Sequence, residues 1–388
     1  MTENRTAYLC PRIFDGSAFH MEGALLVDGG RVVGIVPIGD LDDAIPRHVL
    51  TGGILSPGFV DLQVNGGGGV MLNDDQSVDA LRRISKAHAT LGATSILPTL
   101  ITDSPEKTVA AIDAVEAAIT ADIPGIIGLH LEGPHLSVAR KGAHEARFIR
   151  PMTDRDLAIL TEAARRLPVL KMTVAVESVT PAQIRQLTDA GLIISLGHTE
   201  ASAAQAKEAA AAGATCVTHL FNAMSQLGNR EPGLVGTALS QPNLSAGLIA
   251  DGIHVHPDSI GIALRSKTGP GSIFLVSDAM AVAGSDLQEF RLGTRRVLRT
   301  DGRLTLEDGT LAGADLDQLT AIRNLIRWGF ADHATALAMA TTAPAAVIGE
   351  TGRLGCLGPG TWADFVHFDP GGSDPASVWL KGTRLTGA

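Results

Sequence analysis

The sequence predicts an α/β fold built on a (β/α)8 barrel of the TIM type, with a small β-sandwich domain formed by the N- and C-terminal segments. Eight short apolar runs rich in β-branched residues recur between residues 56 and 349. Segments with helical spacing of apolar residues separate them, and the runs hardly alternate, which is typical of parallel strands buried on both faces. The repeat covers about 290 residues, a usual length for such a barrel.

The two ends of the chain are expected to pair as one β domain. Residues 1–55 contain short strand patterns and a Gly29-Gly30 turn, and residues 350–388 are again β-like. Residues 56–349 then form the barrel.

Local signals support the helices between the strands. Ser104 precedes Pro105 and Thr180 precedes Pro181, a cap followed by proline at the first helical position, and Gln183 completes a capping box with Thr180. A charged, glycine-punctuated stretch at 290–311 predicts a hairpin inserted after the eighth strand. The eight expected strands are 58–65, 94–102, 125–133, 170–177, 192–199, 216–224, 244–253 and 273–280.

Composition excludes several classes of protein. The 31 Lys and Arg against 41 Asp and Glu give a net charge of −10, which disfavours nucleic acid as a partner. With 45% apolar residues the chain is not intrinsically disordered. We find no stretch near the ~18 apolar residues of a membrane span and no signal-peptide pattern. Together with three widely spaced cysteines, this predicts a cytoplasmic protein without a membrane partner.

The candidate metal ligands are Glu132, His198 and His219, at the ends of the third, fifth and sixth strands. The carboxyl ends of the strands carry the chemistry in such barrels. A single histidine more often fills a core, but two imidazoles and one carboxylate together are a ligand set of catalytic divalent metals. The set suits zinc best in our expectation, with iron, manganese or cobalt as alternatives.

Asp278, at the end of the eighth strand, is the expected general base, because a carboxylate beside an activated water can take its proton and return it to a leaving group. Alternatively it is a further ligand or a helix cap. Gln63 and Asn65 on the first strand are poor ligands, so we expect one metal per chain. Arg140-Lys141 and Arg230 are candidates to bind an anionic group, whereas Arg295-Arg296 is expected to lie exposed on the surface.

Nine short motifs occur in order along the chain: PGFVDLQVNG (57–66), HLEGP (130–134), KGAH (141–144), GH (197–198), THLFNAM (218–224), REPG (230–233), ADGIH (250–254), SDA (277–279) and GTLAG (309–313). Together they resemble those of the N-acetylglucosamine-6-phosphate deacetylases of the amidohydrolase superfamily. The resemblance runs from about residue 50 to 369, and its specificity lies in the ordered set.

The resemblance implies metal-dependent hydrolysis of the acetamide of N-acetylglucosamine 6-phosphate to glucosamine 6-phosphate and acetate. It implies that Glu132, His198 and His219 hold the metal and that Asp278 is the acid and base. It implies that His144 polarises the acetamide carbonyl and contacts the substrate with Ala143. Some relatives carry His-x-His at Gln63 and Asn65 and can take two metals, so this chain resembles the single-metal branch. His135 also departs from the aromatic residue of relatives.

The same resemblance implies a sugar-phosphate site and a homodimer. Arg230 matches an arginine that reaches the phosphate in the neighbouring subunit, which would make dimerisation part of the active site. The residues implied to line the sugar-phosphate site are Asn222, Ala223, His254, Leu311, Ala312 and Gly313.

Three alternatives remain open from the sequence. N-acetylgalactosamine 6-phosphate differs from the expected substrate by the orientation of one hydroxyl, so its deacetylation is the nearest alternative. A dihydroorotase-like activity is disfavoured, because it usually needs His-x-His on strand one and a lysine at the end of strand four, where this chain has Glu177. A non-catalytic phosphosugar-binding barrel is the alternative from another class.

Overall fold

The computed structural model describes residues 5–372 and 376–385. The described residues form two compact units. One takes in the residues up to Asp61, His88–Ser95 and those from Gln318 onward, and the other is Leu62–Ala87 with Ile96–Asp317. Every residue of the candidate site described below belongs to the second unit.

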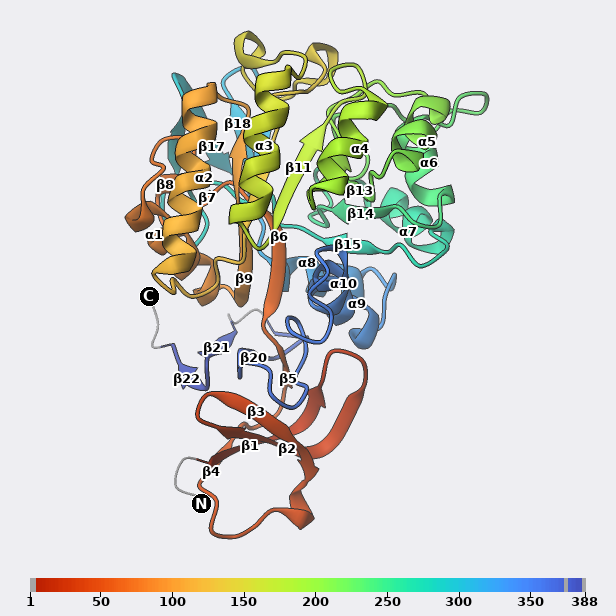
Figure 1. Ribbon diagram of the computed structural model, residues 1–388. Helices are drawn as coiled ribbons and strands as arrows, with labels where there is room; N and C mark the ends of the chain where they lie inside the picture. Colours follow the sequence, from red (N-terminus) through yellow and green to blue (C-terminus); the bar gives the residue numbers. More distant parts are fainter. Residues whose placement is uncertain (1–4, 373–375, 386–388) are drawn as a thin grey trace. The chain divides into compact units, whose positions relative to one another are not determined.

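A (β/α)8 barrel is confirmed (Figure 1). Its eight strands are neighbours in chain order, and all pairs from the second strand to the eighth are parallel. A parallel bridge between Val64 and Ala279 joins the two edges of the sheet. The strands are β6 (Phe59–Val64), β9 (Ala93–Ile101), β10 (Leu129–Glu132), β11 (Leu170–Val174), β12 (Ile193–Leu196), β13 (Cys216–Val217), β14 (Ser245–Leu248) and β15 (Ile273–Leu275).

The helices begin where the sequence signals predict. Ser104 accepts a hydrogen bond from the Lys107 N–H, and Thr180 forms a capping box with Gln183. The longest helix in the described ranges has 16 residues, and none there is long and apolar enough to cross a bilayer. The helices are α1 (Val78–Thr90), α2 (Pro105–Thr120), α3 (Asp154–Arg166), α4 (Pro181–Asp189), α5 (Ala203–Ala211), α6 (Gly233–Ser240), α7 (Pro257–Ser266), α8 (Gln318–Arg327), α9 (His333–Ala340) and α10 (Thr342–Val347).

The expected pairing of the two chain ends in one β domain is also confirmed, as a mixed eight-stranded sheet in which β20 runs antiparallel to β5. Tyr8, Phe365 and Trp379 pack together at its core, with the last two rings stacked. The strands are β1 (Arg5–Phe14), β2 (Phe19–Asp28), β3 (Arg31–Pro37), β4 (Arg47–Val49), β5 (Ile54–Pro57), β20 (Phe365–Phe368), β21 (Ser377–Leu380) and β22 (Thr383–Arg384).

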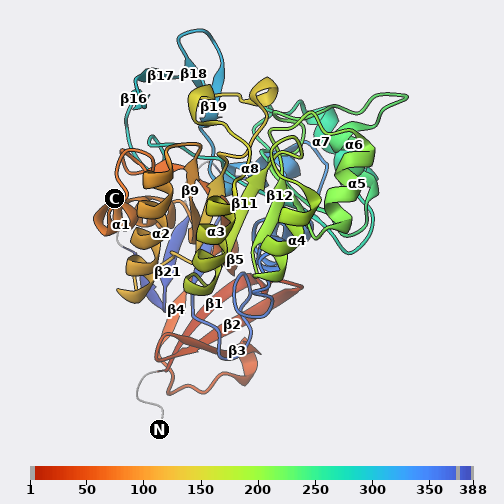
Figure 2. The ribbon, with the colours of Figure 1, turned by 45° about the horizontal axis from the view of Figure 1, so that its top comes forward.

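The predicted insertion after the eighth barrel strand is larger than one hairpin. It forms a sheet of four antiparallel strands, which are labelled in Figure 2. Its inward side chains, including Leu292 and Ala312, form one apolar cluster with Met280 and Ile101 at the mouth of the barrel. We call this element the inserted sheet, and its strands are β16 (Glu289–Leu292), β17 (Arg295–Thr300), β18 (Arg303–Leu306) and β19 (Leu311–Ala314).

Candidate active site

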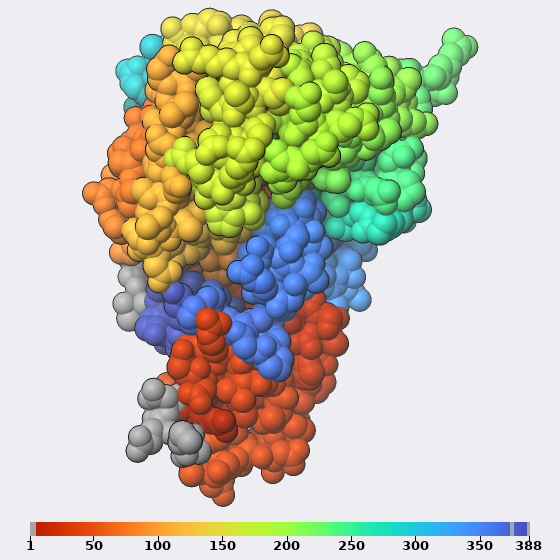
Figure 3. Space-filling model, viewed as in Figure 1, coloured from red at the N-terminus to blue at the C-terminus, as the bar shows by residue number. Residues whose placement is uncertain are grey.

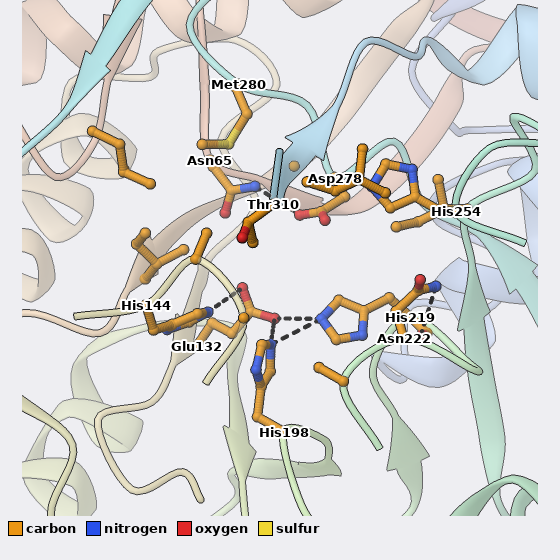
Figure 4. A pocket seen from close by; sticks show the side chains of 18 residues that line it. Asn65, Glu132, His144, His198, His219, Asn222, His254, Asp278, Met280 and Thr310 are labelled. Atoms are coloured by element: carbon orange, nitrogen blue, oxygen red, sulfur yellow. Dashed lines mark hydrogen bonds and ion pairs between the residues drawn. The ribbon is translucent and has the colours of Figure 1, made fainter. Parts of the chain in front are cut away.

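Three ligand-type side chains converge at the carboxyl ends of the barrel strands (Figure 4). Glu132 ends β10, and His198 and His219 follow β12 and β13 by two residues. Glu132 Oε1 lies 3.4 Å from His198 Nε2 and 3.1 Å from His219 Nε2. All three are buried, and one ligand atom from each lies within 4.8 Å of the others. The structure thus brings together the three residues that the sequence predicts as metal ligands.

The orientation of the two imidazoles fits a bound cation. His198 Nδ1 lies 2.8 Å from the Arg140 carbonyl oxygen, which can only accept, so Nδ1 carries the proton and Nε2 presents a lone pair. That lone pair faces His219 Nε2 at 3.0 Å and the Glu132 carboxylate. Two imidazole nitrogens turned to one point beside a carboxylate, with an outer partner fixing the tautomer of His198, form a donor set for a divalent metal.

Backbone geometry aims these side chains. His198, His219 and Asp278 have φ values of 48°, 27° and 52°, in the left-handed region that non-glycine residues rarely adopt. Such a conformation costs of order 1–3 kcal/mol per residue and is concentrated at functional sites. The turn at these positions also ends the barrel strands earlier than predicted, because the backbone leaves the ladder there.

Asp278 lies across the cavity from the three ligands and is held by two amides (Figure 4). Asn65 Nδ2 donates to Asp278 Oδ1 at 2.7 Å, and Gln63 Nε2 donates to the same oxygen at 3.1 Å and to Glu132 Oε1 at 3.0 Å. Gln63 therefore joins the candidate base to the ligand cluster. The sequence predicts these amides only as poor metal ligands, and their position two residues apart on one strand was the signal for a shared role.

The two buried carboxyl groups have opposite pKa shifts. Burial raises the pKa of Asp278 to about 6, and the negative charge of Glu132 adds to the effect. Burial acts on Glu132 in the same direction, but the adjacent imidazoles of His198 and His219 hold its pKa well below the usual value. Two acids whose environments push their pKa values apart are suited to different tasks, one as a permanent anion and one as a proton carrier.

His144 faces the same cavity as a neutral hydrogen-bond donor. Its Nδ1 accepts from the Thr102 backbone N–H at 3.4 Å and lies 2.8 Å from the Thr102 hydroxyl. The proton is therefore on Nε2, which lies 3.8 Å from Glu132 Oε2. Burial and the neighbouring His198 lower the pKa of His144 to about 3, so the ring stays uncharged at neutral pH.

The cavity that these groups share has a volume of about 250 Å³. This is near the low end of ligand cavities, about 300–1,000 Å³, and suits one sugar unit better than an oligosaccharide. The inserted sheet supplies part of its wall through Leu292, Thr310 and Leu311. Of the substrate-binding residues implied by the family resemblance, those that line it are Ala143, His144, Asn222, Ala223, His254, Leu311 and Gly313.

Two of the residues implied to meet the substrate lie elsewhere. Ala312 does not line the cavity, because its side chain is fully buried in the apolar cluster of the inserted sheet. Arg230 is exposed on the segment between β13 and α6, which projects from the surface in Figure 3. His135 is buried beside the Arg150 carbonyl oxygen, at 3.0 Å, and is also absent from the cavity wall.

His254 is fixed by a residue that sequence reasoning left without a role. Asp251 Oδ2 lies 2.6 Å from His254 Nδ1, and Asp251 Oδ1 accepts from the backbone N–H groups of Ile253 and His254, both at 2.8 Å. This arrangement leaves His254 Nε2 free to face the cavity. Thr102 directly follows β9 and Asp251 follows β14 by three residues, and this position just after a barrel strand was the available signal for their supporting roles.

Comparisons with known proteins agree with this geometry. Residues 54–385 match the model of the amidohydrolase family. An N-acetylgalactosamine-6-phosphate deacetylase of Shewanella sp. (strain ANA-3) is 43% identical over 340 residues, 88% of this chain and 85% of that protein. An N-acetylglucosamine-6-phosphate deacetylase of Haemophilus influenzae is 34% identical over 350 residues, 89% and 91% of the two chains. The crystal structure of N-acetylglucosamine-6-phosphate deacetylase from Pasteurella multocida superposes with a TM-score of 0.93 at 32% identity, covering 98% and 99% of the chains.

Proposed function

We propose that this chain, which belongs to the amidohydrolase family, removes the N-acetyl group of N-acetylglucosamine 6-phosphate, giving glucosamine 6-phosphate and acetate. The observation that carries the proposal is the convergence of Glu132, His198 and His219 opposite Asp278 in one buried cavity. The names of the similar proteins supply the substrate class, a phosphorylated N-acetylamino sugar.

In this proposal Glu132, His198 and His219 hold one divalent cation, with zinc preferred and iron, manganese or cobalt also suited to the donors. Such a cation, when bound, lowers the pKa of water and polarises an amide carbonyl. Gln63 and Asn65 donate to the carboxylates around it and therefore leave a single metal position.

The chain's own residues move the protons. Asp278 takes a proton from the attacking water and later donates it to the amine nitrogen, so that the C–N bond breaks with a neutral leaving group. His144 Nε2–H donates to the acetamide oxygen as negative charge develops there, an interaction commonly worth ~3–4 kcal/mol. Because Thr102 occupies His144 Nδ1, this proton is directed into the cavity.

The rest of the substrate would lie along Asn222, Ala223 and His254 and against the inserted sheet at Leu311–Gly313, with Ala312 contributing backbone only. We further propose a homodimer in which Arg230 binds the phosphate in the neighbouring subunit. Its exposure on a projecting segment supports this role, because the arginine has no contact with its own cavity.

Arg230→Ala is expected to raise KM about 10–100-fold with kcat nearly unchanged, since a charge-assisted hydrogen bond to a non-reacting phosphate is worth about 1.5–3 kcal/mol. Steady-state kinetics check this. Arg185→Ala, which removes an exposed arginine from α4, is the matched control. A fall in kcat alone would contradict phosphate recognition by Arg230.

N-acetylgalactosamine 6-phosphate is the second candidate substrate, because the relative from Shewanella sp., at 43% identity, carries that name. The two sugars differ only in the orientation of one hydroxyl. The ratio of kcat/KM for the two epimers under identical conditions decides between them.

Acetate release from both epimers, before and after chelation, tests the whole proposal. We expect release that stops when the metal is removed and returns when zinc is restored. A non-catalytic phosphosugar-binding barrel would bind the sugar without releasing acetate, and that outcome would defeat the enzymatic proposal.

A cytoplasmic location completes the proposal. A phosphorylated sugar is charged and does not cross a bilayer unaided. All three cysteines are free, which suits a reducing compartment.

A further inference from the structure

Arg295 is the first residue of β17 and is not the surface arginine that the sequence predicts. Its guanidinium donates to the Ala143 carbonyl oxygen through Nη2, and the side chain is half-buried. Arg296, the next residue, is exposed and pairs with Glu289 on the neighbouring strand. The expectation for this pair is therefore wrong for one member and right for the other.

Packing around Arg295 supports its hydrogen bond to the Ala143 carbonyl oxygen. Leu292 of the inserted sheet and Ala143 belong to one apolar cluster. At Gly293, an added Cβ would lie only 2.7 Å from Glu145 Oε1, so this turn lies directly on the segment after Ala143. Polar and apolar contacts thus join the inserted sheet to the segment that carries His144.

The segment from Ser137 to His144, which we call the 137–144 loop, is held at its other points by the barrel. The Ser137 N–H donates to the His198 carbonyl oxygen at 2.9 Å, and Arg140 forms an ion pair with Glu200. At the far end, the His144 ring is fixed by Thr102. Between these anchors stands Gly142, with φ of 53°, whose backbone has no side chain to restrict it.

We infer that Arg295 is a positioning residue for the proposed deacetylation: its hydrogen bond to Ala143 fixes the peptide that precedes His144, so that His144 Nε2 stays aimed at the acetamide oxygen. The inference rests on the proposed function. Arg295 belongs neither to the ligand cluster nor to the residues that line the cavity of the candidate active site, so it acts through the loop. A shift of about 1 Å in a catalytic donor can lower the rate on the order of 100-fold.

The inference assigns a function to the inserted sheet. The sheet supplies Leu292, Thr310 and Leu311 to the cavity wall and, through Arg295, fixes the part of the wall formed by Ala143 and His144. Both parts of the wall are then set by one element. A sheet that only covered the barrel would not need a part-buried polar contact to this loop.

Arg295→Met tests the inference, because methionine keeps an unbranched apolar stem but has no donor. We expect kcat to fall about 10–100-fold, with a smaller change in KM and unchanged metal content. Arg295→Lys keeps one donor and should recover part of kcat. Arg296→Met, at the exposed neighbour, is the matched control and should retain wild-type kinetics.

The outcomes separate the inference from the proposed function. Wild-type protein that releases no acetate defeats the proposed function and, with it, the inference. Active wild-type with equal kcat in Arg295→Met and Arg296→Met overturns the inference alone. So does a loss of kcat in which lysine recovers nothing and thermal stability falls in parallel, since the role is then structural. If Arg295→Met does not fold, Arg295→Lys is compared with Arg296→Lys, and equal kcat in these two overturns the inference.

Discussion

Asp278→Asn should lower kcat for N-acetylglucosamine 6-phosphate by about 100- to 10,000-fold, the usual contribution of a general acid–base group, while the protein keeps its metal. Asparagine has nearly the same shape but neither accepts a proton from water nor donates one readily to the leaving amine. Asp278 is absent from the three-residue ligand cluster, so metal content measured on the purified variant should match the wild type.

The amides around Asp278 sharpen this experiment. Asn65 and Gln63 both donate to Asp278 Oδ1, and an asparagine could place its own oxygen there and keep both hydrogen bonds. The variant should therefore fold with unchanged melting temperature. Asp189→Asn, the same chemical change at an exposed position on α4, is the control and should leave kcat unaltered. Full turnover in Asp278→Asn would remove this residue from the proposed mechanism.

The barrel could be predicted from sequence because its signals are local. Apolar runs, helix caps such as Ser104 and Thr180, and the rule that chemistry lies at the carboxyl ends of the strands depend on residues near one another in the chain. The same rule was sufficient to predict that Glu132, His198 and His219 lie together, since each stands at or just after the end of a strand.

What could not be predicted depends on backbone turns and on contacts across the fold. The left-handed backbone at His198, His219 and Asp278 has no signature in these residue types, so the strands were predicted too long. The hydrogen bond from Arg295 to Ala143 joins residues 152 positions apart, and a run of two arginines in a charged hairpin gives no sign of it. The apolar residues of the inserted sheet were likewise not recognised as a cluster, because charged residues surround them in the sequence.

Gln63 shows an intermediate case. Chain position places Gln63 and Asn65 on the same face of the first strand, and residue chemistry predicts that an amide is a poor metal ligand beside histidine. Its positive role, a donor shared by Glu132 and Asp278, required the distance between two other strands.

His198→Ala should lose metal and activity together. Removing the His198 ring leaves Glu132 and His219 as the two remaining candidate metal ligands. The Arg140 carbonyl oxygen also loses the N–H group of His198 from which it accepts a hydrogen bond. Loss of a residue that only hydrogen-bonds to a metal ligand lowers metal affinity about 10–100-fold. We therefore expect the loss of a direct ligand to lower metal affinity by more than ~100-fold. Metal content after dialysis, measured beside acetate release, checks both quantities.

The experiment on His198→Ala is most informative when its results are compared with those for Asp278→Asn. If the three residues hold the cation and Asp278 moves the proton, one variant retains metal without turnover and the other retains neither. His333→Ala, which removes an imidazole at the start of α9, should change neither quantity and controls for the loss of a histidine. Unchanged metal content in His198→Ala would show that the cation binds elsewhere. The inactive but metal-bearing Asp278→Asn would then need another explanation, because the cavity would no longer contain both halves of the proposed chemistry.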